Sequence, residues 1–262
     1  MNTALNLETK VDAIDLENRV KAMYRAVALY PETDFHFEMG RAMAERLGYQ
    51  PSDLDKIPAE SIQSFAGVGC YFKLLDLQKN QRVVDLGSGS GMDTFVASNK
   101  VGHGGSVIGI DMTDEQRAKA TQLRDAAGFC NISYKKAYIE ETGLPTGAYD
   151  AIISNGVVNL SADKKAVFEE AYRLLRSGGK LALSDIVTEK QLPHNITCDA
   201  TLWAACIGGA MQQDHYIALI EAVGFRVVEV HDNPEYHFIS DGATWATDTY
   251  GVKSISLLAV KD

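Results

Sequence analysis

Short apolar runs alternate with longer helical segments along most of the chain from Arg82 onward. The runs are rich in β-branched residues and lie near residues 82–86, 106–110, 132–136, 150–154 and 180–184. Runs of this length with helical patterns between them are typical of a parallel, doubly wound sheet. The pattern therefore predicts an α/β fold for this part of the chain.

Helix signals separate the predicted strands. Thr113-Asp114-Glu115-Gln116 has the form of a capping box and opens a helix that we expect to run to about Ala127. Ser161 is expected to cap another helix, which stops at Ser177-Gly178-Gly179. Each helix would return the chain to the start of the next parallel strand.

The two ends of the chain have different patterns. Residues 10–30 place apolar side chains mostly three or four positions apart, and a second helix is expected from Phe37 to Leu47, ending at Gly48. Residues 225–230 and 255–260 have strand patterns with no strong helix signal between them, which favours antiparallel pairing. We expect an N-terminal helical cap over residues 1–78, and a sheet domain over residues 79–262 with a substrate-side insertion at about 186–215.

Chemistry is concentrated where the first two predicted strands end. The first strand runs through Asp85 into Gly87, Gly89 and Gly91, and the second ends at Asp111. Glycine lets a strand-to-helix turn take positive φ and lets main-chain N–H groups approach a ligand. An acid at the end of the next strand can accept both hydroxyls of a ribose. These features predict a nucleoside site.

The glycine loop differs from that of a dinucleotide site. Dinucleotide folds prefer G-x-G-x-x-G with pyrophosphate on the helix N-terminus, but Met92 occupies the position of the third glycine. Asp85 would repel a pyrophosphate and suits a cation. S-adenosylmethionine carries an ammonium and a sulfonium and no phosphate, so we predict it as the cofactor, with S-adenosylhomocysteine as product.

Composition limits the partners. The 262-residue chain has a formal net charge of −10 and 46% hydrophobic residues, so it offers no cationic stripe for phosphates. We expect a small-molecule substrate, and neither nucleic acid nor membrane as partner. The first ten residues lack a secretory pattern and the four cysteines lack C-x-x-C spacing, which favours a cytoplasmic protein with reduced thiols and no metal site.

Several segments together resemble class I S-adenosylmethionine-dependent methyltransferases, and within them the arsenite methyltransferase branch. They are the glycine loop 85–93, the strand end 107–113, and residues 139–140, 153–160, 173–179, 184–185 and 203–210. The likeness covers about residues 64–225. It implies a Rossmann-like methyltransferase sheet of seven strands, the last of them antiparallel.

The resemblance also implies ten donor-binding residues. Those that would hold the methionine part are Asp85, Gly87, Ser88, Gly89 and Gly91. Asp111 would hold the ribose hydroxyls, and Met112 would lie against adenine. Ile139 and Glu140 would meet the adenine edge, and Asn155 would stand near the sulfonium.

One feature of the arsenite branch is largely missing. Its members bind trivalent arsenic through cysteines in G-C-G, S-N-C and C-x-G-G segments. Here the first two read Gly67-Val68-Gly69 and Ser154-Asn155-Gly156, and only Cys206-Ile207-Gly208-Gly209 keeps its thiol. Soft As(III) favours several thiolates at once. Cys70 could replace the thiol missing at Val68 only if its loop shifts. We therefore predict S-methylation of a low-molecular-weight thiol such as hydrogen sulfide or methanethiol.

Acceptor-side residues are expected from the cap and the insertion. Aromatic side chains can enclose a small substrate and attract a sulfonium, and the candidates, together with one thiol, are Tyr24, Phe65, Tyr71, Trp203 and Cys206. The candidate catalytic residues are Asn155, His215 and Asp185, with His36 and His194 as other possible bases for a thiol proton.

Three other functions stay open on the sequence. The first is methylation of arsenite, methylarsenite or another metalloid. The second is O-, N- or C-methylation of a larger metabolite, and the third is binding of S-adenosylmethionine without turnover. Likeness at the level of the fold assigns the donor better than the acceptor, because acceptor chemistry lies in variable segments.

Overall fold

A mixed sheet forms the centre of the computed structural model, which describes residues 12–197, 207–239 and 241–262. The strand order is β3-β2-β1-β4-β5-β8-β7, and the short β6 pairs beside β5. The strands are β1 (Arg82–Leu86), β2 (Ser106–Asp111), β3 (Ile132–Lys136), β4 (Tyr149–Asn155), β5 (Leu175–Thr188), β6 (Met211–Gln212), β7 (Phe225–Asp232) and β8 (Lys253–Lys261). β1 to β5 are parallel, while β8 is antiparallel to both β5 and β7. The predicted fold class and the antiparallel end are confirmed.

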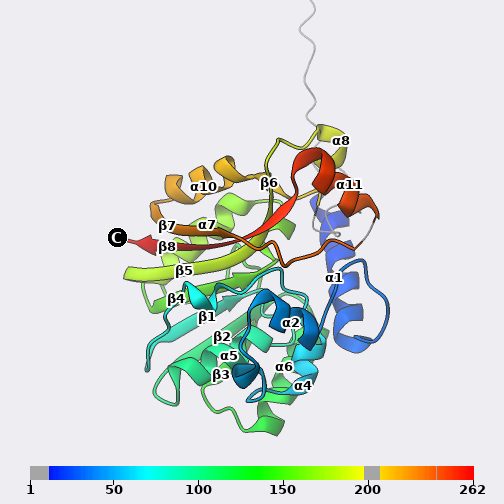
Figure 1. Cartoon of the computed structure of the whole chain (residues 1–262). Coiled ribbons are helices and arrows are strands. Elements are labelled where there is room, and N and C mark those ends of the chain that lie inside the picture. Colours follow the sequence, from blue (N-terminus) through cyan, green and yellow to red (C-terminus); the bar gives the residue numbers. More distant parts are fainter. Residues whose placement is uncertain (1–11, 198–206, 240) are drawn as a thin grey trace, which may run out of the picture.

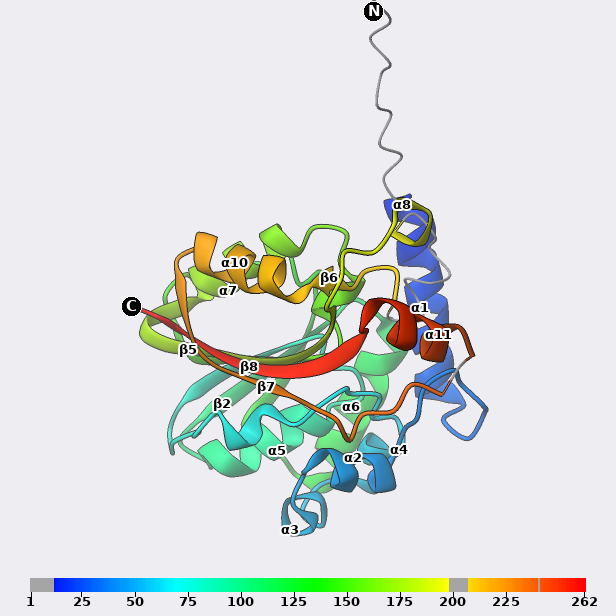
Figure 2. The same cartoon turned by 45° about the horizontal axis from the view of Figure 1, so that its top comes forward.

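Helices cover both faces of the sheet (Figures 1 and 2). α5 (Met92–Val101) and α6 (Asp114–Ala127) lie on one face, and α7 (Lys164–Leu174) and α10 (Gln213–Ala222) on the other. Phe95 of α5 and Phe168 of α7 are fully buried against opposite faces of the sheet. Burial of such side chains contributes about 1.5–3 kcal/mol each. The two layers hold the carboxyl ends of the strands at one edge.

The remaining helices lie mainly at that edge. They are α1 (Ala13–Leu29), α2 (Arg41–Leu47), α3 (Pro51–Leu54), α4 (Ala59–Gln63), η1 (Tyr71–Lys73), η2 (Val158–Leu160), α8 (His194–Thr197) and α11 (Asp241–Tyr250). α1 runs beside α8 and α11 in both views (Figures 1 and 2). Leu16 and Val20 of α1 pack in one apolar cluster with Ile186 and Ala246. In the described part of the chain, no helix has both the length and the hydropathy to cross a membrane.

Both predicted helix caps differ from the structure. Thr113 is the N-cap of α6, but its side chain makes no capping bond. The Gln116 side chain instead accepts a hydrogen bond from Ser90 Oγ at 2.5 Å. α7 begins at Lys164, and Asp163 caps it by accepting from the backbone N–H of Ala166 at 3.0 Å. In both cases a tertiary contact or a nearer acid replaces the local pairing that the sequence pattern predicted.

The expectation of no helix between the last two strands is wrong. α11 occupies this interval, and its Ala246 is buried in the apolar cluster that contains Leu16 and Val20 of α1. Trp245 stays half exposed, with its ring 5.5 Å from that of Tyr250. A helix this short depends on tertiary packing, here in the cluster shared with α1, more than on its local sequence pattern.

Candidate active site

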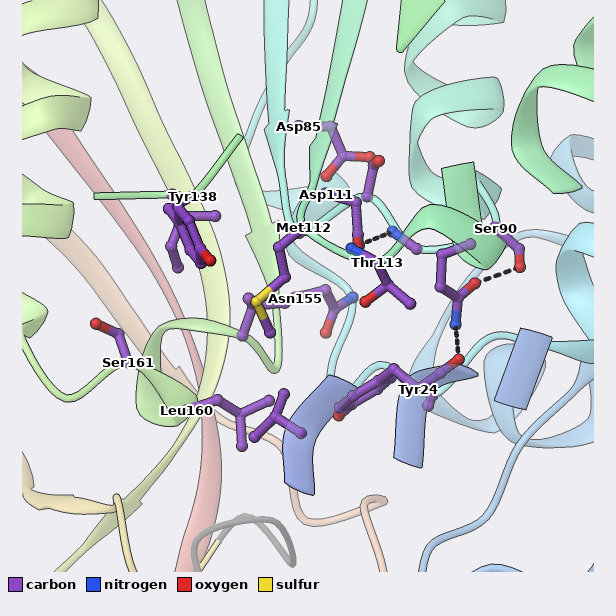
Figure 3. A pocket seen from close by; sticks show the side chains of 18 of the residues that line it. Tyr24, Asp85, Ser90, Asp111, Met112, Thr113, Tyr138, Asn155, Leu160 and Ser161 are labelled. Carbon is purple, nitrogen blue, oxygen red and sulfur yellow. Dashed lines mark hydrogen bonds between the residues drawn. The ribbon is translucent and has the colours of Figure 1, made fainter. Parts of the chain in front are cut away.

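A cavity lies at the carboxyl ends of β1, β2 and β4, and Figure 3 shows part of its wall. Asp85 and Asp111 come from the first two strands and lie next to each other, with Met112 and Asn155 farther along the wall (Figure 3). All ten residues that the resemblance assigned to the donor line this one cavity. The fold therefore brings together segments that are as much as seventy residues apart.

The glycine loop folds back onto the second strand. The backbone N–H groups of Gly87 and Ser88 donate to the carbonyl oxygen of Ile110 at 2.8 and 2.9 Å. Gly87 has φ +76°, and a Cβ there would lie 2.4 Å from a methyl of Val157. Gly91, with φ +93°, is the N-cap of α5. Only glycine fits the first of these positions, both in conformation and in space.

Asp111 fixes the loop from the neighbouring strand. Its Oδ2 accepts from the backbone N–H of Gly89 at 2.9 Å, and its Oδ1 accepts from that of Thr113 at 2.8 Å. An ionised carboxylate has about four lone-pair sites, so both oxygens keep acceptor capacity. Asp111 can therefore hold the loop and still accept two ligand hydroxyls.

The charge of the wall is one-sided. Among the described residues, those that line the cavity include five carboxylates and no lysine, arginine or histidine; the acids are Glu17, Asp85, Asp93, Asp111 and Glu140. Burial raises the pKa of Asp85 well above its usual range, and the nearby charge of Asp93 raises it further. Burial also raises the pKa of Asp111. This wall suits a cationic ligand better than an anionic one.

Sequence reasoning missed a hydrogen-bonded hub on Asp93. This carboxylate lies in the first turn of α5 and accepts from the hydroxyls of Tyr49 and Tyr71, each at 2.6 Å. The side-chain nitrogen of Asn155 lies 3.1 Å from Asp93 Oδ2. Burial raises the pKa of Asp93, while these three partners lower it. The only sequence signal was an acid two positions after the last glycine of the loop.

Asn155 joins the end of β4 to the segment before β1. Its Oδ1 accepts from the backbone N–H of Val68 at 2.8 Å, and its Nδ2 donates to the carbonyl oxygen of Gly69 at 3.0 Å. These bonds occupy the side chain that was predicted to stand near the sulfonium. The contacts favour a positioning role, in which Asn155 holds the segment from Gly67 to Gly69 against the cavity.

Helix α1 closes one side of the cavity. Leu16, Glu17, Val20 and Tyr24 all line it. Gln116, which accepts from the glycine loop through Ser90, donates to the carbonyl oxygen of Tyr24 at 2.9 Å (Figure 3). Tyr138 donates to Glu17 at 2.7 Å and also contacts Lys21. Polar contacts thus hold α1 at both the loop side and the Tyr138 side.

The other predicted acceptor-side residues fall in different places. Tyr24 and Phe65 line the cavity, whereas Tyr71 is fully buried in the neighbouring core and reaches the cavity only through Asp93. Trp203 and Cys206 lie outside the described residues. Of the three whose structure is described, two therefore line the cavity directly.

The predicted bases whose side chains the structure describes do not line the cavity. His215 lies exposed near the start of α10, and His36 belongs to the loop before α2; neither lines the cavity. The side chain of His194 lies outside what the structure describes. Asp185 is fully buried, where its carboxylate accepts from Tyr216 at 2.8 Å and from the N–H of Ile186 at 2.9 Å. Burial raises the pKa of Asp185 to about 6. These positions give His215 and Asp185 no direct access to a substrate.

Cys70 does not replace the missing thiol at Val68. It is buried in the apolar cluster that contains Met92 and Phe95, and it does not line the cavity. Burial, together with the charge of Asp93, raises the pKa of the Cys70 thiol to about 12. It is therefore a neutral thiol in the core rather than a thiolate ligand.

Comparison with known proteins identifies the family. Residues 77–224 match the methyltransferase domain family. The chain is 42% identical over 171 residues to an arsenite methyltransferase of Aquipseudomonas alcaligenes, which covers 62% of this chain and 49% of the relative. It is 39% identical over 166 residues to the human arsenite methyltransferase, covering 60% of this chain and 44% of the relative. The chain spans about half the length of the curated relatives it matches.

Solved structures agree with the fold. The crystal structure of an arsenic(III) S-adenosylmethionine methyltransferase from Chlamydomonas reinhardtii is 29% identical, with a TM-score of 0.63 over 86% of this chain and 74% of that one. A geranyl diphosphate C-methyltransferase from Streptomyces coelicolor, solved with S-adenosylhomocysteine, is 14% identical with a TM-score of 0.69 over 96% of this chain and 100% of that one. The second likeness is one of fold alone.

The comparisons correct one prediction and confirm another. Methylation of a low-molecular-weight thiol is wrong as the main interpretation, because several curated relatives and a solved structure that match this chain are arsenite methyltransferases. The family match covers more than half of the chain. The chain belongs to the methyltransferase domain family, which confirms the predicted class of S-adenosylmethionine-dependent methyltransferases.

Proposed function

We propose that this protein transfers the methyl group of S-adenosylmethionine to trivalent arsenic, as arsenite or methylarsenite. The observation that carries the proposal is the 42% identity over 171 residues to an arsenite methyltransferase. The cavity supports it, because the predicted donor-binding residues line a space that continues to the segment before β1.

The residues of the wall fit the donor. Asp111 has free acceptor capacity for the ribose hydroxyls, beside the N–H groups of the glycine loop. Asp85 is a buried acid with no salt bridge among the described residues, which suits the ammonium of the methionine part. Met112 and Ile139 offer apolar surface for the adenine, and Glu140 is held in place by the hydroxyl of Ser161. These are our assignments for the donor site.

The reaction needs alignment more than acid–base chemistry. The lone pair of arsenic forms the new bond to carbon, so the positive charge passes to arsenic, which becomes formally pentavalent, and the carbon–sulfur pair stays on sulfur as the neutral thioether. Such a displacement requires the three atoms in line, at about 3–3.5 Å before reaction. No proton must leave the arsenic atom, so the absence of a described histidine at the cavity is compatible with this chemistry. Helix α1 would support this displacement by excluding water from the cavity.

We assign the acceptor end of the cavity to the segment before residue 79. Ser61, Ser64, Phe65, Ala66 and Gly67 line it there, next to Asp93 and Asn155. No thiol among the described residues lines the cavity. The protein thiol that we propose for arsenic is Cys206, on the basis of its C-x-G-G segment.

Labelled S-adenosylmethionine with arsenite and with methylarsenite tests the acceptor. We expect labelled methylated arsenic from both acceptors. Turnover should be faster with methylarsenite, because one of its three arsenic bonds is already made to carbon and fewer thiolates are needed.

Cys206→Ser should lower arsenic-dependent turnover by about tenfold or more. Cys130→Ser, which removes an exposed thiol, is the matched control and should leave turnover unchanged. Product from a larger metabolite, with neither arsenical accepted, would contradict the proposal.

Donor binding should weaken on acidification. The pKa of Asp85 is raised in the free protein, and a cationic donor favours the ionised carboxylate, so binding releases a proton. Affinity for S-adenosylmethionine is therefore full above the raised pKa and falls as the pH drops through it, by at most about tenfold per pH unit for one proton. Calorimetry between about pH 5 and about pH 7 measures this, a range in which the donor ammonium stays protonated. In Asp85→Asn the slope should be smaller, and an equal slope in both proteins would show that Asp85 is not the linked group.

A further inference from the structure

One lysine is buried behind the wall of the cavity and has no part in the chemistry above. Lys164 is the first residue of α7, is 6% exposed and does not line the cavity. Burial lowers the pKa of Lys164 to about 8, although the charges of Asp185 and Glu140 raise it. The side chain is therefore mainly an ammonium at neutral pH. A buried charge is costly unless it makes specific hydrogen bonds, so the partners of Lys164 indicate its role.

The ammonium binds a turn that supplies part of the cavity wall. Lys164 Nζ donates to the carbonyl oxygen of Asn159 at 3.1 Å and to that of Ser161 at 2.9 Å. These carbonyls belong to the turn between η2 and α7, from which Leu160 and Ser161 line the cavity (Figure 3). Buried carbonyls need partners. Lys164 therefore favours the one shape of the turn in which both carbonyls face the ammonium.

Asp185 holds the same turn from the sheet. Burial raises the pKa of this acid, and it is lowered by the hydroxyl of Tyr216, by the charge of Lys164 and by a hydrogen bond from the backbone of Asn159. The backbone of Asn159 therefore meets Asp185 through its N–H and Lys164 through its carbonyl. Two buried groups of opposite charge thus fix one turn, although neither of them lines the cavity.

Ser161 connects the turn to an acid of the cavity wall. Its hydroxyl donates to Glu140, and it accepts from the backbone N–H of Asp163 at 3.0 Å. Glu140 lines the cavity and is the residue that we assign to the adenine edge. Lys164 fixes the carbonyl of Ser161, and Asp163 fixes its hydroxyl. Both contacts hold Ser161 where it reaches Glu140.

We propose that Lys164 is a positioning residue for the nucleoside end of the donor, although its side chain does not line the cavity. It acts through the turn, by keeping Leu160 and Ser161 on the wall and Glu140 in place beside them. A wall that already has its bound shape costs less to order when a ligand enters. The inference rests on the donor assignment proposed above, and it does not depend on the identity of the acceptor.

Titration calorimetry with two ligands tests this role in Lys164→Met. The ligands are S-adenosylhomocysteine and 5′-methylthioadenosine, which has the same nucleoside and lacks the amino-acid part. Methionine has a similar length and no charge, so the turn loses its donor while most of the packing stays. We expect both ligands to bind about tenfold or more weakly, and by the same factor. Lys165→Met is the matched control, because Lys165 is exposed, pairs with Glu169 and should leave both affinities unchanged.

Ser161→Ala tests the same path and leaves the buried lysine in place. It removes the hydroxyl that reaches Glu140, so both ligands should bind about threefold or more weakly. The two substitutions act through one contact, so Ser161→Ala should add little when Lys164→Met is already present. Ser161→Ala also decides the question if Lys164→Met does not fold.

Three results would overturn the inference. The first is unchanged affinity for both ligands in Lys164→Met or, if that protein does not fold, in Ser161→Ala. The second is a larger loss for S-adenosylhomocysteine than for 5′-methylthioadenosine, which would show that the whole site has loosened. The third is a wild-type protein that binds neither ligand, which would remove the donor assignment and this inference together.

Discussion

Replacing Gly87 with alanine is expected to destabilise the protein and to abolish donor binding. The residue has φ +76°, a region that costs a non-glycine residue about 1–2 kcal/mol. The added Cβ would lie 2.4 Å and 2.5 Å from the two methyl groups of Val157, and such overpacking costs about 1–3 kcal/mol. Together these effects lower the free energy of unfolding by about 2–5 kcal/mol. Chemical denaturation measures the loss, and calorimetry at low temperature measures the donor affinity of the protein that remains folded.

Gly128→Ala is the matched control for this substitution. Gly128 ends α6 with φ +73°, and a Cβ there would meet nothing within 4 Å. It therefore carries the conformational cost alone, about 1 kcal/mol, and lies outside the cavity. We expect donor affinity to be unchanged in Gly128→Ala. If both alanine variants lose the same stability and both keep the donor, the contact with Val157 has no effect and the glycine loop tolerates a side chain.

Local features of the sequence predict well that the glycine loop and the acid of the next strand lie together at one wall of the cavity. Gly87, Gly89 and Gly91 are neighbours along the chain, and their loop is joined to Asp111 through one backbone bond. The β-branched runs on either side form β1 and β2, paired in register from Arg82 to Leu86. The loop, the strands and the acid all belong to one βαβ unit, so short-range sequence patterns are sufficient to predict them.

The rest of the cavity depends on contacts that no short pattern encodes. Asp93 meets Tyr49 and Tyr71, which precede it by 44 and 22 positions, and it meets Asn155, which follows 62 positions later. Gln116 has the sequence position for a capping box, yet its side chain spans from Ser90 to α1. Tertiary hydrogen bonds there prevail over local ones, because Ser90 and Tyr24 engage both ends of the Gln116 side-chain amide.

The error about the acceptor has a physical cause as well. The thiol hypothesis depended on two positions, Val68 and Gly156, that lack a cysteine. Ligands for one soft atom can come from several segments, so two absent thiols do not define the acceptor. The identity with an arsenite methyltransferase extends over 171 residues. Evidence spread over the chain is more informative here than two exchanged side chains.

Asp111→Ala is expected to cause the largest loss of donor affinity that leaves the fold intact. The carboxylate holds Gly89 at 2.9 Å and, in our assignment, accepts both ribose hydroxyls. Hydrogen bonds to a charged group contribute about 1.5–3 kcal/mol each, so two lost bonds reduce affinity by about 10²- to 10⁴-fold. Because the ribose lies away from the reacting carbon, KM for the donor should rise while kcat at saturating donor stays within a few-fold.

Asp114→Ala distinguishes this effect from a general loss of negative charge. Asp114 is an exposed acid three positions away that pairs with Lys136 at 2.7 Å and does not line the cavity. An exposed pair of this kind contributes about 0–1 kcal/mol, so donor affinity and KM should match the wild type. A fall of kcat at unchanged KM in Asp111→Ala would place Asp111 in the chemical step instead of the ribose site. An equal loss of donor affinity in Asp114→Ala would mean that the donor responds to net charge, because of these two acids only Asp111 lines the cavity.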